Sequence, residues 1–310
     1  MNIAMNPESQ TILVICGPTA SGKTSLALAI ASHLHRCAIF SADSRQTYKD
    51  LSILTGKDIP ENLPQGTKIY GTDFLEADEN ISIAVFVKKT LPLIEHNLSQ
   101  KIPVIIVGGS GLYLKALTSN LSDINIPPDP KLREELASLS VSDLQDKLRG
   151  IDQALFNRLN HSDQNNPRRL VRHIEKILSV GEPSPAPSLS ANFHWIGLSL
   201  SPATQKKLIE KRVNDRVGNG AIDEVSKLIF RLGGDKAFSL STSLGFKEIA
   251  DYLDGEINNK EMVDSWVKSE LDYARAQMVW FKKQPGIIWY DETTDKDALA
   301  VKLASKLQTK

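Results

Sequence analysis

The stretch that decides the fold is Thr11–Thr24, with the sequence TILVICGPTASGKT. Its first part, Thr11–Cys16, is a short run rich in β-branched residues, which is typical of a buried parallel strand. Its second part, Gly17–Thr24, matches the pattern G-x-x-x-x-G-K-[ST] of a phosphate-binding loop. The following residues, Ser25–His35, repeat apolar positions at helical spacing. A strand, a glycine-rich loop and a helix in this order predict a phosphate site at the end of the strand.

The residue types of this loop suit phosphate chemistry. Glycines let the backbone wrap, so that successive N–H groups and the N-terminus of the helix point at phosphate oxygens. Lys23 supplies a positive charge, and the Thr24 hydroxyl is suited to hold Mg²⁺, the one cofactor we expect. The loop alone does not decide which phosphate compound binds. The predicted phosphate-binding residues are Gly17, Pro18, Thr19, Ala20, Ser21, Gly22, Lys23 and Thr24.

A carboxylate follows the second expected strand. Residues Ala38–Ser41 are strand-like, and the chain continues as Ser41–Gln46, SADSRQ. Since the C-terminal ends of parallel strands line the ligand crevice, Asp43 is expected to face the phosphate loop. A carboxylate beside phosphates either holds a metal or acts as a base, because like charges otherwise repel. The alternative is a purely structural role, as the N-cap of a following helix.

A second glycine turn follows the third expected strand. The run Pro103–Val107 (PVIIV) is strand-like, and Gly108–Tyr113 reads GGSGLY. The turn lies at the same edge of the predicted sheet, where it leaves room for a ligand or for another part of the chain. An ordinary tight turn would have the same composition.

The remaining pattern predicts an α/β fold with a helical insertion. A phosphate-loop core with a mainly parallel sheet flanked by helices is expected over residues 11–121 and 191–310. Residues 122–190 are polar and helical and end in a Pro/Ser-rich linker, GEPSPAPSLS. Residues 1–10 are expected to be disordered. Helices are predicted over Ile81–Leu98, with a kink or break at Pro92, and over Lys206–Leu232 and Glu261–Lys283.

Composition restricts the class of protein. The 310 residues contain 37 Lys+Arg and 37 Asp+Glu, so the formal charge is zero and bulk positive charge cannot hold a nucleic acid. Two cysteines are too few for a disulfide framework. The apolar run Ile12–Cys16 is far shorter than the roughly 20 residues of a membrane span, so we expect a cytoplasmic protein with no membrane contact. No pattern predicts assembly, and a monomer is the expectation.

Several motifs together resemble the tRNA dimethylallyltransferase family, also called tRNA isopentenyltransferases, in its bacterial form. The matching segments are GPTASGKT at Gly17–Thr24, SADSRQ at Ser41–Gln46, GGSGLYLKAL at Gly108–Leu117, NPRRLVR at Asn166–Arg172, LGFKE at Leu244–Glu248 and YARAQMVWF at Tyr273–Phe281. The phosphate loop is shared with many kinases and nucleotide-binding proteins, whereas the pair SADSRQ and GGSGLY is far more specific.

The resemblance implies a reaction and roles for residues. Such an enzyme transfers a dimethylallyl group from dimethylallyl diphosphate to N6 of the adenosine 3′ of the anticodon (position 37), in tRNAs reading codons that begin with U. It implies that Lys23, Thr24-bound Mg²⁺ and Arg212 stabilise the leaving diphosphate. Asp43 would take the proton from N6 as general base. The alternative for Arg212 is a solvated arginine on a charged helix.

The resemblance also implies contacts to the anticodon stem-loop of tRNA. The target adenine must leave its stack to reach a buried site. The implied tRNA-binding residues are Asp43, Ser44, Arg45, Gln46, Ser110, Arg133, Arg168, Arg169, Leu170, Val171 and Arg172. Residues Asn165–Lys176 carry four basic residues and one acidic residue, a local basic patch in a neutral protein, although an exposed helix face would explain it too.

The chain departs from the family in three places, and rival functions remain. Lys68–Asp73 replaces the family's His-His pair, Ala276 stands where the family has Arg, and Phe246 stands where it has Tyr. A small-molecule kinase would use the same loop but does not account for SADSRQ with GGSGLY. A prenyl transferase acting on free adenine nucleotides needs neither the basic patch nor the insertion. A non-catalytic RNA-binding module needs no base such as Asp43.

Overall fold

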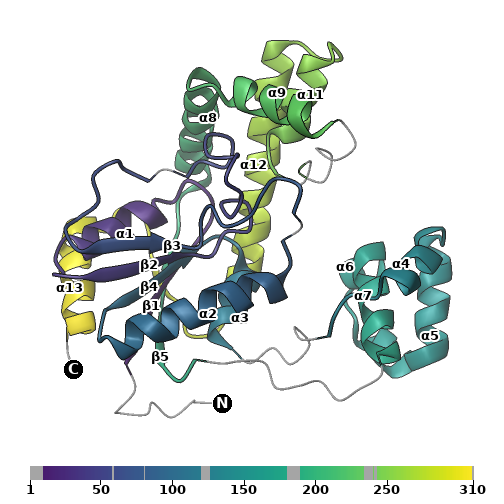
Figure 1. Ribbon diagram of the computed structural model, residues 1–310, viewed down its shortest axis with the longest axis horizontal. Coiled ribbons are helices and arrows are strands. Elements are labelled where there is room, and N and C mark those ends of the chain that lie inside the picture. The colour runs from purple at the N-terminus through teal and green to yellow at the C-terminus, as the bar shows by residue number, and fades with distance from the viewer. Residues whose placement is uncertain are drawn as a thin grey trace. The chain divides into compact units, whose positions relative to one another are not determined.

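The computed structural model describes residues 10–57, 59–79, 81–119, 126–179, 189–233, 240 and 243–308 (Figure 1). The chain divides into two compact units, Met1–Ser119 with Ser188–Lys310, and Asn120–Pro187. The N-terminus expected to be disordered lies, apart from Gln10, outside the described residues, as does most of the expected linker. Each unit is described by itself below.

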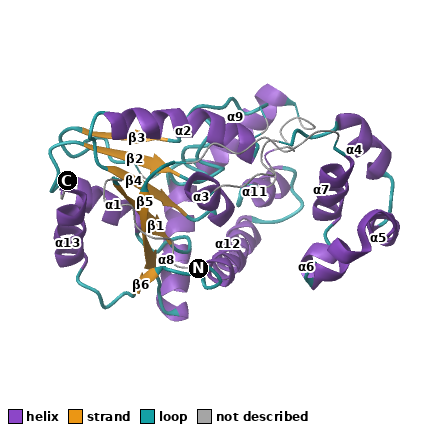
Figure 2. Ribbon diagram, turned by 90° about the horizontal axis from the view of Figure 1, so that it is seen from below, coloured by secondary structure: helices purple, strands orange, loops and turns teal. Residues whose placement is uncertain are grey.

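The larger unit is built on a six-stranded sheet in the order β3-β2-β4-β1-β5-β6, in which every neighbouring pair is parallel (Figure 2). The expected parallel α/β fold is therefore confirmed. Crossovers between parallel strands require the connecting segments, most of them helical, that the sequence alternates with the strands. The strands are β1 (Thr11–Cys16), β2 (Cys37–Ser41), β3 (Thr67–Tyr70), β4 (Val104–Gly108), β5 (Asn192–Leu198) and β6 (Ile288–Tyr290).

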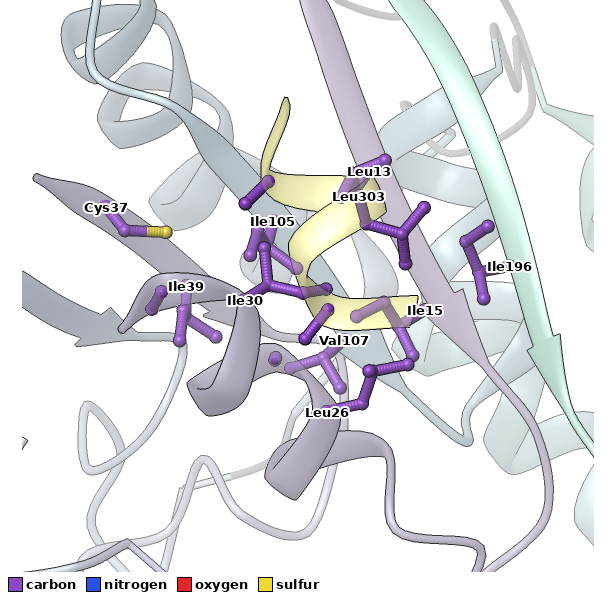
Figure 3. Packing of buried hydrophobic residues seen from close by; sticks show 14 of the residues in the cluster. Leu13, Ile15, Leu26, Ile30, Cys37, Ile39, Ile105, Val107, Ile196 and Leu303 are labelled. Atoms are coloured by element: carbon purple, nitrogen blue, oxygen red, sulfur yellow. The ribbon is translucent and has the colours of Figure 1, made fainter. Parts of the chain in front are cut away.

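Helices cover both faces of the sheet (Figure 1). On one face, α1 (Lys23–Ala31) and α13 (Lys296–Gln308) pack on the strands, and α2 (Ile83–Ser99) and α3 (Gly111–Thr118) pack on the other. Figure 3 shows Leu13 and Ile15 of β1 beside Leu26 and Ile30 of α1, all of them buried. This packing fixes the start of α1, and with it the phosphate loop, against the end of β1.

The predicted break at Pro92 does not occur, because α2 runs unbroken from Ile83 to Ser99. Proline removes one hydrogen bond from the helix, to the carbonyl of the residue four positions earlier. Here that residue, Lys88, and Pro92 itself are exposed to solvent. Water can therefore bind the carbonyl group that the helix leaves unpaired.

Four helices form a second core beside the sheet, and the predicted helix Lys206–Leu232 is in fact two of them. The chain turns at Gly220, whose φ of 98° lies in the left-handed region that glycine adopts readily. Buried Trp266 packs in this core with Ile209 and Val213. The helices are α8 (Pro202–Gly218), α9 (Ala221–Leu232), α11 (Phe246–Leu253) and α12 (Asn259–Phe281).

The smaller unit contains only helices among its described residues. They are α4 (Pro130–Ala137), α5 (Val141–Arg158), α6 (His161–Gln164) and α7 (Pro167–Leu178). Leu148, Phe156, Leu170 and Ile174 are buried in its core. The helical character predicted for this part of the chain is confirmed.

Candidate active site

The phosphate loop is shaped by two glycines. Gly17 has φ 144°, and a Cβ there would lie 2.5 Å from the carbonyl oxygen of Leu198 on β5, so no side chain fits. Gly22 has φ 85° and caps the N-terminus of α1 in the left-handed conformation. The first turn of α1 thus follows the loop directly and directs its free N–H groups towards it.

Lys23, the first residue of α1, folds back over the loop. Its Nζ donates a hydrogen bond to the carbonyl oxygen of Pro18 at 2.6 Å. Burial, reinforced by the positive charge of Arg212, lowers the pKa of Lys23 to about 8. The carboxylates of Asp43 and Glu270 act in the opposite direction without restoring the usual pKa, and a bound phosphate would raise it further.

A pocket of about 350 Å³ opens beside the loop, at the ends of β1, β2 and β4. It brings together many of the predicted site residues: Thr19, Lys23, Thr24, Asp43, Ser44, Arg45, Gln46 and Arg212. Part of its wall is apolar, from Ile39, Leu54, Ile59, Ile69, Val107 and Leu244. The pocket therefore has a cationic, phosphate-binding end and room for a hydrocarbon group.

Asp43 stands in this pocket and caps a turn. Its Oδ1 accepts a hydrogen bond from the Arg45 backbone N–H at 2.9 Å. The residues that follow form a turn and no helix, so the alternative role as a helix N-cap is wrong. The turn fixes the carboxylate while it lines the pocket.

Arg212 also belongs to the pocket, so the alternative of a solvated arginine is wrong. Its Nη1 donates to Thr19 Oγ1 at 3.3 Å, and its Nη2 donates to the Gly56 carbonyl oxygen at 3.0 Å. The same carbonyl accepts from Gln46 Nε2 at 3.2 Å. Arg212 therefore joins the phosphate loop to the segment after Asp43, and Gln46 helps to hold that segment in place.

A buried ion pair beside Arg212 was not predicted. Arg216 Nη1 lies 2.7 Å from Glu270 Oε1, and both side chains are less than a tenth exposed. Both residues line the pocket. The pair joins α8 to α12 at the wall of the site, and no local pattern in either helix indicates it.

Glu270→Ala should destabilise the protein by about 3–5 kcal/mol, because it leaves the charge of Arg216 buried without this partner. Urea unfolding would measure the loss. The matched control is Glu210→Ala, which removes an exposed partner lying 3.7 Å from Lys206 and should cost no more than about 1 kcal/mol. Equal costs for the two variants would contradict the assigned importance of the buried pair.

The second glycine turn is shaped by α12. A Cβ at Gly109 would collide with the side chain of Gln277, and one at Gly111 would collide with the ring of Trp280. Gln277 bridges the two loops: its Oε1 accepts from the Thr19 N–H at 2.8 Å, and its Nε2 donates to the Gly109 carbonyl at 3.1 Å. The close approach of these two side chains of α12 explains why residues 109 and 111 are glycines.

Four of the predicted RNA-binding arginines, Arg133, Arg168, Arg169 and Arg172, belong to the helical unit and differ in their surroundings. Arg168 and Arg169 are exposed, and Arg169 is paired with Asp163. Arg133 and Arg172 are both paired with the buried carboxylate of Glu175. The Arg133–Glu175 pair joins α4 to α7, whereas Arg172 and Glu175 lie on the same helix, α7.

The other residues predicted with these arginines have different positions. The Leu170 side chain is fully buried in the core of the helical unit, so it packs the helix instead of facing a partner. Val171 is partly buried against the same core. In the larger unit, Ser110 is absent from the pocket lining but lies near the hydroxyl of Tyr273, which lines it.

The oxygens near the loop fit Mg²⁺. Thr24 and Asp43, a hydroxyl and a carboxylate, line the same pocket, and Mg²⁺ prefers a few such oxygens completed by water and phosphate. Within the described residues, no three His, Cys, Asp or Glu side chains gather as a metal-binding cluster. Over the same part of the chain, no helix has both the length and the apolar character needed to cross a membrane.

Fold and site define an α/β protein with a phosphate-binding loop and a pocket that is part apolar. The model of the IPP transferase family matches residues 46–284, and the chain belongs to this family. The chain is 36% identical over 304 residues to a tRNA dimethylallyltransferase of Acetivibrio thermocellus, covering 94% of this chain and 95% of that one. It is 33% identical over 286 residues to one of Picosynechococcus, covering 91% and 94%.

Two solved structures are similar to this protein over most of its chain. The tRNA isopentenylpyrophosphate transferase of Bacillus halodurans matches with a TM-score of 0.67 and 30% identity, over 96% of this chain and 97% of that one. A eukaryotic dimethylallyltransferase acting on tRNA matches with a TM-score of 0.78 over 96% of this chain and 78% of that one. At 22% identity, that second match shows the fold alone.

Proposed function

We propose that this protein transfers a dimethylallyl group from dimethylallyl diphosphate to N6 of the adenosine 3′ of the anticodon, in tRNAs that read codons beginning with U. The observation that carries the proposal is the pocket itself, which joins the phosphate loop, Asp43 and an apolar wall. Family membership and relatives named tRNA dimethylallyltransferase support it. We expect a monomer that acts in the cytoplasm.

The donor would bind with its diphosphate on the loop and its five-carbon group against the apolar wall. Departure of diphosphate from an allylic carbon builds negative charge on the diphosphate oxygens. Loop N–H groups, Lys23 and Arg212 are in place before that charge develops, which is the condition for effective electrostatic stabilisation. Mg²⁺, held by Thr24, would add positive charge at the same diphosphate.

The acceptor would bring its exocyclic N6 to Asp43. As the nitrogen bonds to the allylic carbon, it acquires a positive charge and must lose a proton. A carboxylate fixed by the Arg45 N–H can accept that proton. A kinase would instead require a third phosphate on the loop and a hydroxyl acceptor.

The exposed arginines of α7 are proposed to contact the RNA backbone. Replacing Arg168 and Arg169 together by alanine should weaken binding of an anticodon stem-loop, and more so at low salt. The slope of log K against log salt should fall in magnitude by about 1.4–1.8, as for two lost phosphate contacts. Filter binding at several salt concentrations measures it, with Arg149→Ala, a partly buried arginine paired with Asp146, as control. An unchanged slope would exclude these arginines.

A transfer assay with radiolabelled dimethylallyl diphosphate and Mg²⁺ tests the function. The acceptors are an anticodon stem-loop with adenosine 3′ of the anticodon, the same RNA with guanosine there, and AMP. Label on the adenosine RNA alone is expected. Label on AMP would identify a nucleotide prenyl transferase. Phosphate transfer from ATP without any prenyl transfer would identify a kinase.

A further inference from the structure

One residue of the pocket has no role in the chemistry above. Among the described residues that line the pocket, Tyr273 of α12 is the one with an aromatic ring. It is open to solvent in part, with 37% of the residue exposed, as is Ile59, another large lining residue, at 38%. A partly exposed ring in the wall of the pocket lies where the pocket meets solvent.

The Tyr273 hydroxyl has polar neighbours. They include Ser110 and Gln277, and Gln277 is itself anchored to both glycine-containing loops. Burial of this end of the side chain raises the pKa of the hydroxyl to about 12, and the charge of Asp43 acts in the same direction. The hydroxyl is therefore neutral at physiological pH, and the ring lies within the electrostatic range of Asp43.

We propose that the ring of Tyr273 is the surface on which the extruded adenine stacks while its N6 faces Asp43. The inference rests on the proposed function. An adenine that leaves the anticodon loop loses its stacking partners, at a cost of a few kcal/mol. An aromatic ring replaces them without selecting a particular base, so stacking supplies affinity and Asp43 supplies the chemistry.

The opposite assignment would make the ring part of the wall for the prenyl group. Six aliphatic side chains already serve that wall, from β2, β3, β4 and the segments after β2 and before α11. A hydrocarbon also gains nothing from a ring whose hydroxyl lies near Ser110, Gln277 and the carboxylate of Asp43. These features favour a flat, partly polar occupant that enters from outside.

The test separates the ring from its hydroxyl. Tyr273→Leu removes the ring, whereas Tyr273→Phe keeps it and removes the hydroxyl. Phe230→Leu is the matched control, because Phe230 is 92% exposed on α9 and does not line the pocket. Each variant binds a stem-loop that carries fluorescent 2-aminopurine in place of the target adenosine, and each is assayed for single-turnover transfer to the adenosine stem-loop. Circular dichroism checks folding.

In the wild-type protein, Tyr273→Phe and Phe230→Leu, the fluorescence of 2-aminopurine should be quenched by stacking. In Tyr273→Leu it should stay bright, and the KM for the RNA should rise roughly 5- to 150-fold, the range for one lost stacking contact. The KM for dimethylallyl diphosphate should not change. If Tyr273→Leu does not fold, Tyr273→Phe still decides, because bright fluorescence in that variant would contradict stacking on the ring.

Other outcomes overturn the inference and leave the function standing. Quenching in Tyr273→Leu equal to the wild type would exclude the ring as the stacking surface. A raised KM for the donor with an unchanged KM for the RNA would assign the ring to the prenyl group. Failure of the proposed function would look different, because the wild-type protein would then transfer no label to the adenosine stem-loop.

Discussion

Asp43→Asn should lower the single-turnover rate of prenyl transfer by roughly 100- to 10,000-fold, the range that a general base contributes. The substitution isolates the proton-accepting function. An asparagine side chain retains an oxygen that can accept the hydrogen bond from the Arg45 N–H, so the turn after β2 should persist. It loses the negative charge and the ability to take the N6 proton. Quenched-flow measurements with the adenosine stem-loop give the rate.

Donor binding is the second readout for this variant. Binding of isopentenyl diphosphate, a non-allylic and therefore unreactive analogue, should change little in Asp43→Asn. Loss of that binding would mean that Asp43 holds the metal or the loop, and would reject its role as base. Asp50→Asn is the control, since Asp50 pairs with Arg231 and does not line the pocket. Asp43→Ala also loses the hydrogen bond from the Arg45 N–H. Comparison with Asp43→Asn therefore shows how much of the rate depends on that hydrogen bond.

The sequence was sufficient to place the chemistry at one edge of the sheet. Thr11–Cys16 and Ala38–Ser41 both have the pattern of buried parallel strands, and parallel strands end on the same side. It follows that residues after them, Thr19, Lys23 and Thr24 on one side and Asp43 to Gln46 on the other, meet in one pocket. The second glycine turn was predicted at the same edge for the same reason.

The residues that hold this edge together could not be predicted in the same way. Gln277 and Thr19 are 258 positions apart, and nothing local in α12 says which of its side chains reaches the loop. Arg216 and Glu270 belong to helices that are charged along much of their length, so the buried pair does not differ from its exposed neighbours in the sequence. Gly109 and Gly111 can be read in the sequence. The sequence does not show that the side chains of Gln277 and Trp280 approach them too closely for a Cβ.

The strand β3 was missed for another reason. It has four residues and lies at the edge of the sheet, paired with β2 alone, so its sequence TKIY carries only a short pattern. Its Tyr70 stacks on Phe40 of β2 with ring centroids 4.8 Å apart. This segment is where the chain lacks the family's His-His pair, and here tertiary pairing decides the structure.

Lys23→Met should lower the rate of transfer by roughly 100- to 1,000-fold, the loss seen when one group that stabilises a developing negative charge is removed. Methionine keeps much of the length and apolar volume of the side chain but has no charge. The variant should bind isopentenyl diphosphate more weakly as well, because in the proposed complex the lysine faces the diphosphate before and during its departure. A change confined to RNA binding would contradict this placement.

The pH dependence gives a sharper test of Lys23. With a pKa of about 8 in the free protein, the lysine is charged below that pH and increasingly neutral above it. A bound diphosphate favours the charged form and raises the pKa, so binding above pH 8 takes up a proton. Affinity for isopentenyl diphosphate should therefore be flat from pH 7 to 8 and then fall by at most about tenfold per pH unit. The diphosphate is almost fully ionised in this range and adds little slope, since the second pKa of a phosphate ester is about 6.

Lys23→Arg is the matched variant for this dependence. An arginine remains charged up to a pH of about 12, so the fall in affinity above pH 8 should disappear while the positive charge stays. Isothermal titration in buffers of different ionisation enthalpy would count the protons taken up on binding. If the wild-type protein and Lys23→Arg lost affinity in parallel above pH 8, the titrating group would lie elsewhere. If only the wild type lost it, the proton belongs to Lys23, and the diphosphate lies against that side chain.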